Sequence, residues 1–371
     1  MNEIQEDLQD SSVLNSIRLS RIIPPILIGL AVVIWLMYRQ LDIDELSKIK
    51  WDFHIFFWIF LAVFMYIVRH LFYSWRMRIM TDYEFSWPKS IELIVLWEFA
   101  SAVSPTAIGG SGVALFLLAQ EKLSTAKTVS IVLYSMVIDT IFFVVSLPII
   151  YLILGPIMIR PGMDSLSDLD GFGYTFFGVI LFMTAYGAVF YYGLFINPTS
   201  IKRLLLLISR FPLLKRFKKD LRKTAMDVVE TSKEMQKKNF VFHVKAMVAT
   251  TGAWITRFLA INCIIIALIS STPFDFYNQF LIMARAETMH VTTAFSPTPG
   301  GAGVAEYLFG GYFIDYVSEG IASLVALVWR LITYYTYLVG GAIIIPIWIR
   351  EVMNRRRKEA LKLSVSKSET F

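Results

Sequence analysis

Two segments of the chain repeat one phrase rich in glycine and proline, and its residue types suit the binding of an anion. The phrase reads SPTAIGGSGVA from Ser104 to Ala114 and SPTPGGAGVAE from Ser296 to Glu306. Proline removes a backbone donor and glycine permits positive φ, so we expect a helix to stop in the later copy and restart at Gly303 or Val304. Free backbone amides at a helix start bind anions such as a lipid phosphate. The predicted binding residues are Ser104, Pro105, Gly109, Gly110, Gly112, Ser296, Pro297, Pro299, Gly300, Gly301, Gly303 and Glu306.

The phrase has two other readings. It could form tight turns that let two helical hairpins pack tip to tip without a ligand, because glycine and proline are common in membrane helices. A nucleotide-binding loop is excluded, because the phrase lacks a closing Lys-Ser/Thr pair and a preceding strand.

Three charged residues, Asp139, Arg257 and Arg330, lie inside otherwise apolar segments. Insertion scales put the cost of such an ion at about 2.5–3.5 kcal/mol, so these residues are expected to serve pairing or function. Asp139 follows Ser104 at almost the spacing at which Arg330 follows Ser296, which makes the two charges equivalent positions of a repeat. We therefore predict an ion pair between Asp139 and either Arg330 or Arg257. A purely structural pair is the alternative.

Three glutamates flank the phrase: Glu98 precedes the first copy, Glu287 precedes the second and Glu306 closes it. A carboxylate at such a place suits proton coupling or contact with an ammonium headgroup, although Glu306 could instead stabilise the first turn of a helix. The four histidines lack metal-ligand spacing, and the single cysteine, Cys263, forbids an intrachain disulfide. No catalytic residue, metal site or cofactor is predicted.

Membrane helices must position these residues. The 371 residues are 56% hydrophobic and 17% charged, with a mean hydropathy of +0.60, which lies outside the usage of soluble proteins. A helix needs about 20 apolar residues to cross about 30 Å of hydrocarbon. The sequence predicts such spans at Ile22–Tyr38, Phe53–Val68, Thr128–Ile159, Gly171–Ile201, Ala246–Pro273 and Ile321–Ile349.

The net charge of +6 comes from lysines and arginines that gather beside the spans. Basic groups follow the second, fourth and sixth spans, whereas the loop after the third carries Asp164, Asp168 and Asp170. Under the positive-inside rule, both termini of this multi-pass protein are cytoplasmic and its location is the cell (inner or cytoplasmic) membrane. Because this rule accounts for the charge, nucleic acid is not expected as a partner.

The two copies of the phrase lie in additional apolar regions, 91–120 and 276–316, which must enter and leave by one face if six segments cross. The predicted fold is an all-α polytopic membrane protein with about six full spans and two re-entrant helical hairpins in an inverted repeat. Its halves would be residues 51–160 and 241–349. Ten full crossings are the alternative, because they fit the charge distribution equally well.

Three segments flank or join these halves. Residues 1–20 are polar and are expected to form a cytoplasmic segment without signal-peptide features, which places the transmembrane domain at 21–349. Residues 202–240 carry apolar side chains at helical spacing opposite a basic set, which predicts a cytoplasmic or interfacial amphipathic helix; a solvated linker helix is the alternative. Residues 350–371 are a basic cytoplasmic tail, expected to be disordered from Asn354.

The later phrase, Pro-x-Pro-Gly-Gly-x-Gly-x-x-Glu, with its weaker early echo, resembles the lysylphosphatidylglycerol synthase transmembrane-region family, also called flippase-like domain proteins. The resemblance covers nearly the whole chain from the first span to Ile349 and implies a stand-alone member without the synthase domain. In the two-part members of that family, the membrane region is associated with moving aminoacylated phosphatidylglycerol between leaflets. The resemblance implies that the matched residues matter here: Pro297, Pro299, Gly300, Gly301, Gly303 and Glu306. The early copy departs from the pattern at Ala107 and Ile108, which argues against a symmetric two-site mechanism.

The sequence thus favours a translocator for an anionic or aminoacylated phospholipid or a similar amphipathic lipid. Transport would be passive or ion-coupled, because no ATP-binding motif is present. Membrane lipids with anionic headgroups are the expected partners, and a separate lipid-synthesis enzyme is a further candidate. The alternatives are a membrane enzyme or accessory subunit of lipid or glycan biosynthesis that uses Glu98, Glu287 or Glu306, and a scaffold that docks a partner through Lys215–Lys223.

Overall fold

A computed structural model describes residues 51–368, apart from 105, 106, 122, 198, 294, 295, 297, 299, 300, 302 and most of 201–234, together with residues 44, 47 and 49. All regular structure in this part of the chain is helical. The N-terminal segment 1–20, the first predicted span and most of the predicted amphipathic segment 202–240 lie outside the described residues.

The described chain folds into a series of helices joined mostly by short connections. The α-helices are α4 (Phe53–Met80), α5 (Trp87–Val103), α6 (Ala107–Ala119), α7 (Thr125–Leu154), α8 (Gly171–Tyr191), α11 (Phe240–Leu268), α12 (Phe276–Thr293), α13 (Val304–Phe313), α14 (Glu319–Arg330) and α15 (Thr336–Ser368). Short 3-10 helices lie at Gly155–Met158 and Leu166–Asp168, and π-helical turns lie at Tyr192–Ile196 and Leu331–Tyr335. The second π-turn joins α14 directly to α15.

Polar side chains fix where several helices begin. Asp52, Ser124 and Asn239 each accept a hydrogen bond from the backbone N–H three residues later, at 3.2, 3.1 and 2.9 Å. Asp170 caps α8 in the same way, with two backbone donors. These caps satisfy amides that the first turn of a helix leaves unpaired, so the starts of α4, α7, α8 and α11 follow from local sequence.

Five described segments are long and apolar enough to cross a membrane: Phe53–Met80, Lys127–Met158, Gly171–Tyr191, Phe240–Leu268 and Glu319–Arg355. They correspond to the second to sixth predicted spans. Large apolar side chains are exposed on the molecule, among them Phe53 at 82% and Leu152 at 84%, as expected for surfaces that face lipid. The expectation of an all-helical membrane protein is confirmed for the described residues.

Two helices are longer than the sequence indicated. The helix α4 does not end at Val68 but continues to Met80, so Arg69 and Arg76 lie inside the helix bundle, where both are buried. The helix α15 continues to Ser368, so the expected disorder from Asn354 is wrong up to that residue. The part of α15 from Asn354 to Ser368 contains arginine, lysine, glutamate, alanine and leucine, all of which favour helix.

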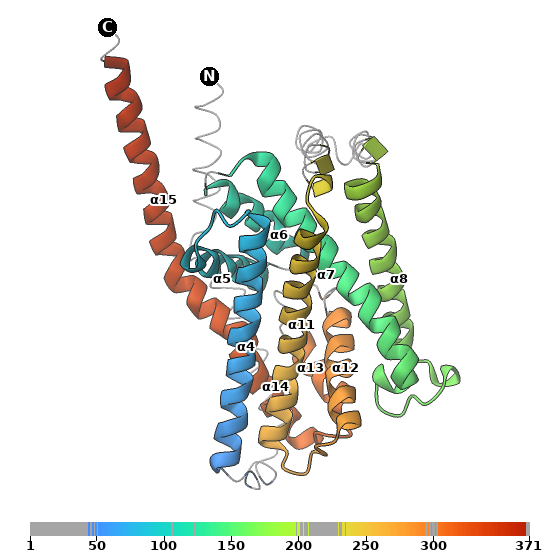
Figure 1. Ribbon diagram of the computed structural model, residues 1–371. Helices are drawn as coiled ribbons and strands as arrows, with labels where there is room; N and C mark the ends of the chain where they lie inside the picture. The colour runs from blue at the N-terminus through green and yellow to red at the C-terminus, as the bar shows by residue number, and fades with distance from the viewer. Residues whose placement is uncertain are drawn as a thin grey trace.

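The helices α5 and α6 form a first hairpin beside the C-terminal end of α4 (Figure 1). Its two ends are joined by an ion pair between Lys89 Nζ and Glu121 Oε1, at 2.9 Å. Glu121 also accepts hydrogen bonds from Trp348 Nε1 at 2.7 Å and Arg355 at 3.1 Å, which attach this end of the hairpin to α15.

The helices α12 and α13 form a second hairpin in the opposite half of the molecule (Figure 1). Its ends are joined by a hydrogen bond from the Tyr316 hydroxyl to Asn278 Oδ1, at 2.7 Å. Just before α12, the ring of Phe274 packs edge-on against Trp58 near the start of α4, with centroids 5.6 Å apart. The two hairpins therefore have their bases at opposite ends of α4.

The same order of elements occurs twice in the described chain. A long helix, two shorter helices that form a hairpin, and a second long helix appear first as α4, α5, α6 and α7. They appear again as α11, α12 and α13, followed by α14 and α15. Each copy of the glycine and proline phrase lies at the joint of its hairpin.

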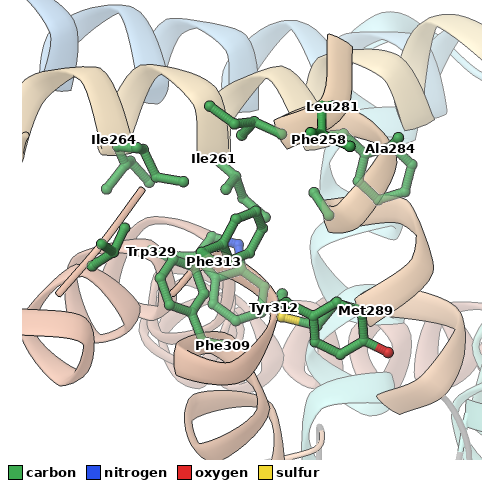
Figure 2. Packing of buried hydrophobic residues seen from close by; sticks show 14 of the residues in the cluster. Phe258, Ile261, Ile264, Leu281, Ala284, Met289, Phe309, Tyr312, Phe313 and Trp329 are labelled. Atoms are coloured by element: carbon green, nitrogen blue, oxygen red, sulfur yellow. The ribbon is translucent and has the colours of Figure 1, made fainter. Parts of the chain in front are cut away.

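The main apolar core lies between α11, the second hairpin and α14 (Figure 2). Phe258 and Ile261 of α11 face this core, and Phe309 of α13 stacks on Trp329 of α14 with ring centroids 5.9 Å apart. Close packing of this kind leaves little room for rearrangement, so the core holds the second hairpin in place. It thereby holds the end of α12 and the start of α13, which flank the described residues Ser296, Thr298 and Gly301.

Candidate functional site

The later copy of the phrase breaks the helix as predicted. The helix α12 ends at Thr293 and α13 begins at Val304, with Gly303 as its N-cap. Gly301 and Gly303 have φ angles of 70° and 83°, which residues other than glycine rarely adopt. Pro297, Pro299 and Gly300 lie outside the described residues.

The early copy has a different backbone. The helix α5 ends at Val103, and Ser104 is extended, with its hydroxyl donating to the Ala100 carbonyl at 2.7 Å. The helix α6 begins already at Ala107, so Gly109, Gly110 and Gly112 are helical and supply no second glycine loop. The later copy has Pro299 near the place of Ala107, and without that proline the helix can resume sooner. Pro105 lies outside the described residues.

Glu306 holds the glycine segment to α14. Its Oε2 accepts a hydrogen bond from the backbone N–H of Gly303 at 2.7 Å, and its Oε1 accepts one from Arg330 Nε at 2.9 Å. Both side chains are buried, and the Arg330 guanidinium also lies 4.0 Å from the centroid of the Tyr334 ring. Glu306 thus has the helix-capping role that was one of its two predicted uses, and both of its oxygens are engaged.

The predicted pair between Asp139 and Arg330 or Arg257 is wrong. Asp139 Oδ1 instead contacts Arg76 of α4 at 2.6 Å and accepts a hydrogen bond from Trp254 Nε1 at 2.9 Å. The error follows from the predicted end of the second span at Val68, which places Arg76 among the basic groups that follow the span and not inside the helix α4. The helix α4 packs along α11, and this packing places Arg76, and neither of the two predicted partners, in contact with Asp139 on α7.

Glu98 belongs to a second buried pair that sequence reasoning missed. Its Oε1 lies 2.8 Å from Arg69 of α4, whose other terminal nitrogen donates to the Tyr337 hydroxyl at 2.9 Å. This network joins α4, α5 and α15. The signal in the sequence was the apolar pattern that continues around the buried Arg69 and Arg76, in LFYSWRMRIM from Leu71 to Met80.

Glu287 lies deep in the fold, with 1% of its surface exposed. It accepts a hydrogen bond from the Ser146 hydroxyl of α7, and no lysine, arginine or histidine of the described chain lies within 4.0 Å of its carboxylate. His290, one turn further along α12, packs among the rings of Phe143 and Trp254, with centroids 5.6 and 4.8 Å away. The nearby Arg285, which sequence reasoning also missed, pairs with Asp315 at 2.5 Å.

Arg257 is the remaining predicted charge, and it has no carboxylate partner among the described residues. It is half-buried on α11, and its guanidinium lies 5.5 Å from the centroid of the Trp254 ring. No group of histidine, cysteine, aspartate or glutamate side chains in the described part has the arrangement of a metal site. The described charges thus lie inside an apolar helical bundle, where retained ions usually serve pairing or function.

The sequence matches a known family over most of its length. The family model described as the lysylphosphatidylglycerol synthase TM region covers residues 22–341, which include both hairpins. The chain belongs to this family. A UPF0104 membrane protein of Archaeoglobus fulgidus is similar to it, with 24% identity over 304 residues that cover 77% of this chain and 85% of that protein. The membership of the lysylphosphatidylglycerol synthase TM region family that the later phrase suggested is confirmed.

Proposed function

We propose that this protein is a flippase-like translocator that moves an anionic or aminoacylated phospholipid, or a similar amphipathic lipid, between leaflets. The observation that carries the proposal is the pair of hairpins with bases at opposite ends of α4, each interrupted at a copy of the glycine and proline phrase. Hairpins that enter from opposite faces and break near the midplane are a transporter architecture, in which each broken helix borders a cavity reached from one side.

In this proposal the two hairpins are re-entrant, the halves 51–160 and 241–349 form an inverted repeat, and both termini are cytoplasmic. The buried charges support it, because paired ions inside an apolar bundle line pathways for charged groups more often than they face lipid. Three such pairs each join two helices: Arg69 with Glu98, Arg76 with Asp139, and Glu306 with Arg330. Substrate contact would fall on the residues of the two joints, above all Ser296, Gly301 and Gly303.

Transport in this scheme is passive or coupled to an ion, and Glu287 is the carboxyl group placed for proton coupling. Family membership supports the lipid as the transported molecule, since the family is described by a lipid synthase whose membrane region it represents. A separate lipid-synthesis enzyme is the further partner in this proposal.

The test is leaflet exchange in liposomes that contain the purified full-length protein and a headgroup-labelled anionic phospholipid, read by quenching of the outer leaflet. We expect exchange well above that of protein-free liposomes. Gly301→Leu should abolish it, because leucine at a φ of 70° is strained and distorts the joint. Gly112→Ala is the control, since it alters a helical glycine with open space around it. No exchange by the wild-type protein across several headgroups, with and without a pH gradient, contradicts the proposal and favours a role in biosynthesis.

A further inference from the structure

Arg257 differs from the other buried arginines of the bundle. Each of those has a carboxylate oxygen within 2.9 Å: Arg69 with Glu98, Arg76 with Asp139, Arg285 with Asp315 and Arg330 with Glu306. Arg257 has no carboxylate within 4.0 Å and no hydrogen bond to any side chain or carbonyl of the described residues. It is half-buried, so its guanidinium retains surface that a ligand can reach.

The surroundings of Arg257 carry an uncompensated positive charge. Tyr66, Arg69 and Tyr73 of α4 and Glu98 of α5 lie close enough to interact electrostatically with its guanidinium, as does His290 of α12. Glu98 is already paired with Arg69, so these two arginines and one carboxylate leave one excess positive charge. The Nε of Arg69 is a second donor in this region, buried and without a hydrogen-bond partner.

A structural role for Arg257 does not offset the cost of placing it there. A cation in the middle of a membrane helix costs about 2.5–3.5 kcal/mol on insertion scales. The Trp254 ring, whose centroid lies 5.5 Å from the guanidinium, returns about 0.5–2 kcal/mol at best. The Trp254 indole is also fixed elsewhere, since its N–H donates to Asp139. Among the described residues, the charge of Arg257 therefore has no partner that offsets this cost.

We propose that Arg257 binds the phosphate of a phospholipid headgroup, with the buried Arg69 adding to the local positive charge. The planar guanidinium offers a pair of N–H donors that match two phosphate oxygens, which makes arginine well suited to such a ligand. The site is near the second hairpin, because His290 on α12 is close enough to Arg257 to interact with it electrostatically and precedes Ser296 by six residues. This inference rests on the proposed function and names the part of the lipid that the protein recognises.

The test is binding of defined probes to the purified full-length protein in neutral detergent, read by thermal unfolding and native mass spectrometry. The probes are short-chain phosphatidic acid, diacylglycerol of the same chains and inorganic phosphate. We expect phosphatidic acid to raise the unfolding temperature of the wild-type protein and diacylglycerol to leave it unchanged. Arg257→Gln should weaken phosphatidic acid binding by about tenfold or more, which corresponds to about 1.4 kcal/mol. Arg257→Lys should retain part of the phosphatidic acid binding, because lysine keeps the positive charge but lacks the planar pair of N–H donors.

Arg160→Gln is the matched control, since Arg160 pairs with Asp170 in a loop away from the hairpin joints; its binding of phosphatidic acid should equal that of the wild type. Without lipid, Arg257→Gln should be at least as stable as the wild type, because it removes an uncompensated charge. Unchanged binding by Arg257→Gln, or a lipid-free protein that is less stable, overturns the proposal. An equal effect of inorganic phosphate overturns it in favour of a free-phosphate site.

The two proposals can fail separately. If Arg257→Gln still exchanges lipid between leaflets at the wild-type rate, the phosphate site is contradicted and translocation stands. If the wild-type protein binds phosphatidic acid through Arg257 but exchanges no lipid, the phosphate site stands and translocation is contradicted.

Discussion

Glu306 and Arg330 form a buried ion pair that joins the glycine segment of the second hairpin to α14. The carboxylate divides its oxygens between the Gly303 amide, at 2.7 Å, and Arg330 Nε, at 2.9 Å. Because each group is buried, neither can be satisfied by water when the other is lost. The backbone at Gly303 and the position of α14 are therefore linked through one side chain.

Loss of the charge on Glu306 should destabilise the protein strongly. Removing one partner of a buried pair costs about 3–5 kcal/mol, so Glu306→Gln should lower the thermal unfolding temperature in detergent by several degrees. A double variant, Glu306→Gln with Arg330→Met, should recover part of this loss, since no buried charge is left alone. Glu319→Gln, an exposed carboxylate in the first turn of α14, should change little. Equal stability of Glu306→Gln and Glu319→Gln would count against the linkage.

Local features of the fold were predictable from sequence, whereas contacts between distant helices were not. The restart of a helix at Gly303 or Val304 follows from prolines and glycines that act on their own backbone, and it was predicted correctly. The partner of Asp139 was not, because Arg76 reaches it only through the packing of α4 on α11. The predicted second span ended at Val68, because Arg69 interrupts the apolar run, although the helix α4 continues to Met80. A helix can carry buried arginines when each finds a carboxylate, and single-sequence hydropathy does not contain that information.

Alanine at Gly301 and at Gly112 should have opposite effects, although both glycines belong to copies of one phrase. Gly301 has a φ of 70°, so alanine there should cost about 1–2 kcal/mol of unfolding free energy. Gly112 lies within α6 and has open space where the methyl group of an alanine would point, so alanine there should gain about 0.5–1 kcal/mol. Thermal unfolding of the two variants and of the wild type shows whether each substitution lowers or raises the unfolding temperature. A stabilising Gly301→Ala would show that this backbone is not held at positive φ.

Glu287 and Glu98 should respond differently to the same substitution. Glutamine at 287 keeps an oxygen that accepts from the Ser146 hydroxyl, and no cation of the described chain loses a partner. We expect Glu287→Gln to unfold at or above the wild-type temperature but to lose any dependence of lipid exchange on a pH gradient. Glu98→Gln leaves the buried Arg69 without its carboxylate and should be clearly less stable. A large loss of stability in Glu287→Gln would mean that its charge is part of the fold.

Asp82 connects three parts of the molecule at the base of the first hairpin. It follows α4, and its carboxylate lies 2.5 Å from Lys238, which precedes α11, and 3.3 Å from Lys127 of α7. Partial burial acts to raise the pKa of Asp82, but the two ammonium groups outweigh it and hold that pKa below its ordinary value of 3.8. A depressed pKa means that the carboxylate contributes stability above about pH 3.8 and loses it as the pH falls further.

Asp82→Asn should therefore be less stable than the wild type at pH 6, and the difference should vanish as the pH falls through and below 3.8. The expected difference is about 0.2–1 kcal/mol, because the carboxylate is largely exposed and screened by solvent. Asparagine tolerates the φ of 54° at this position, so the variant removes charge without adding backbone strain. Thermal unfolding from pH 3 to pH 7 at low salt measures the effect, and about 1 M salt should shrink it at every pH. A difference that does not shrink between pH 6 and the acid end would mean that Asp82 stabilises the loop through its shape or hydrogen bonds and not through its charge.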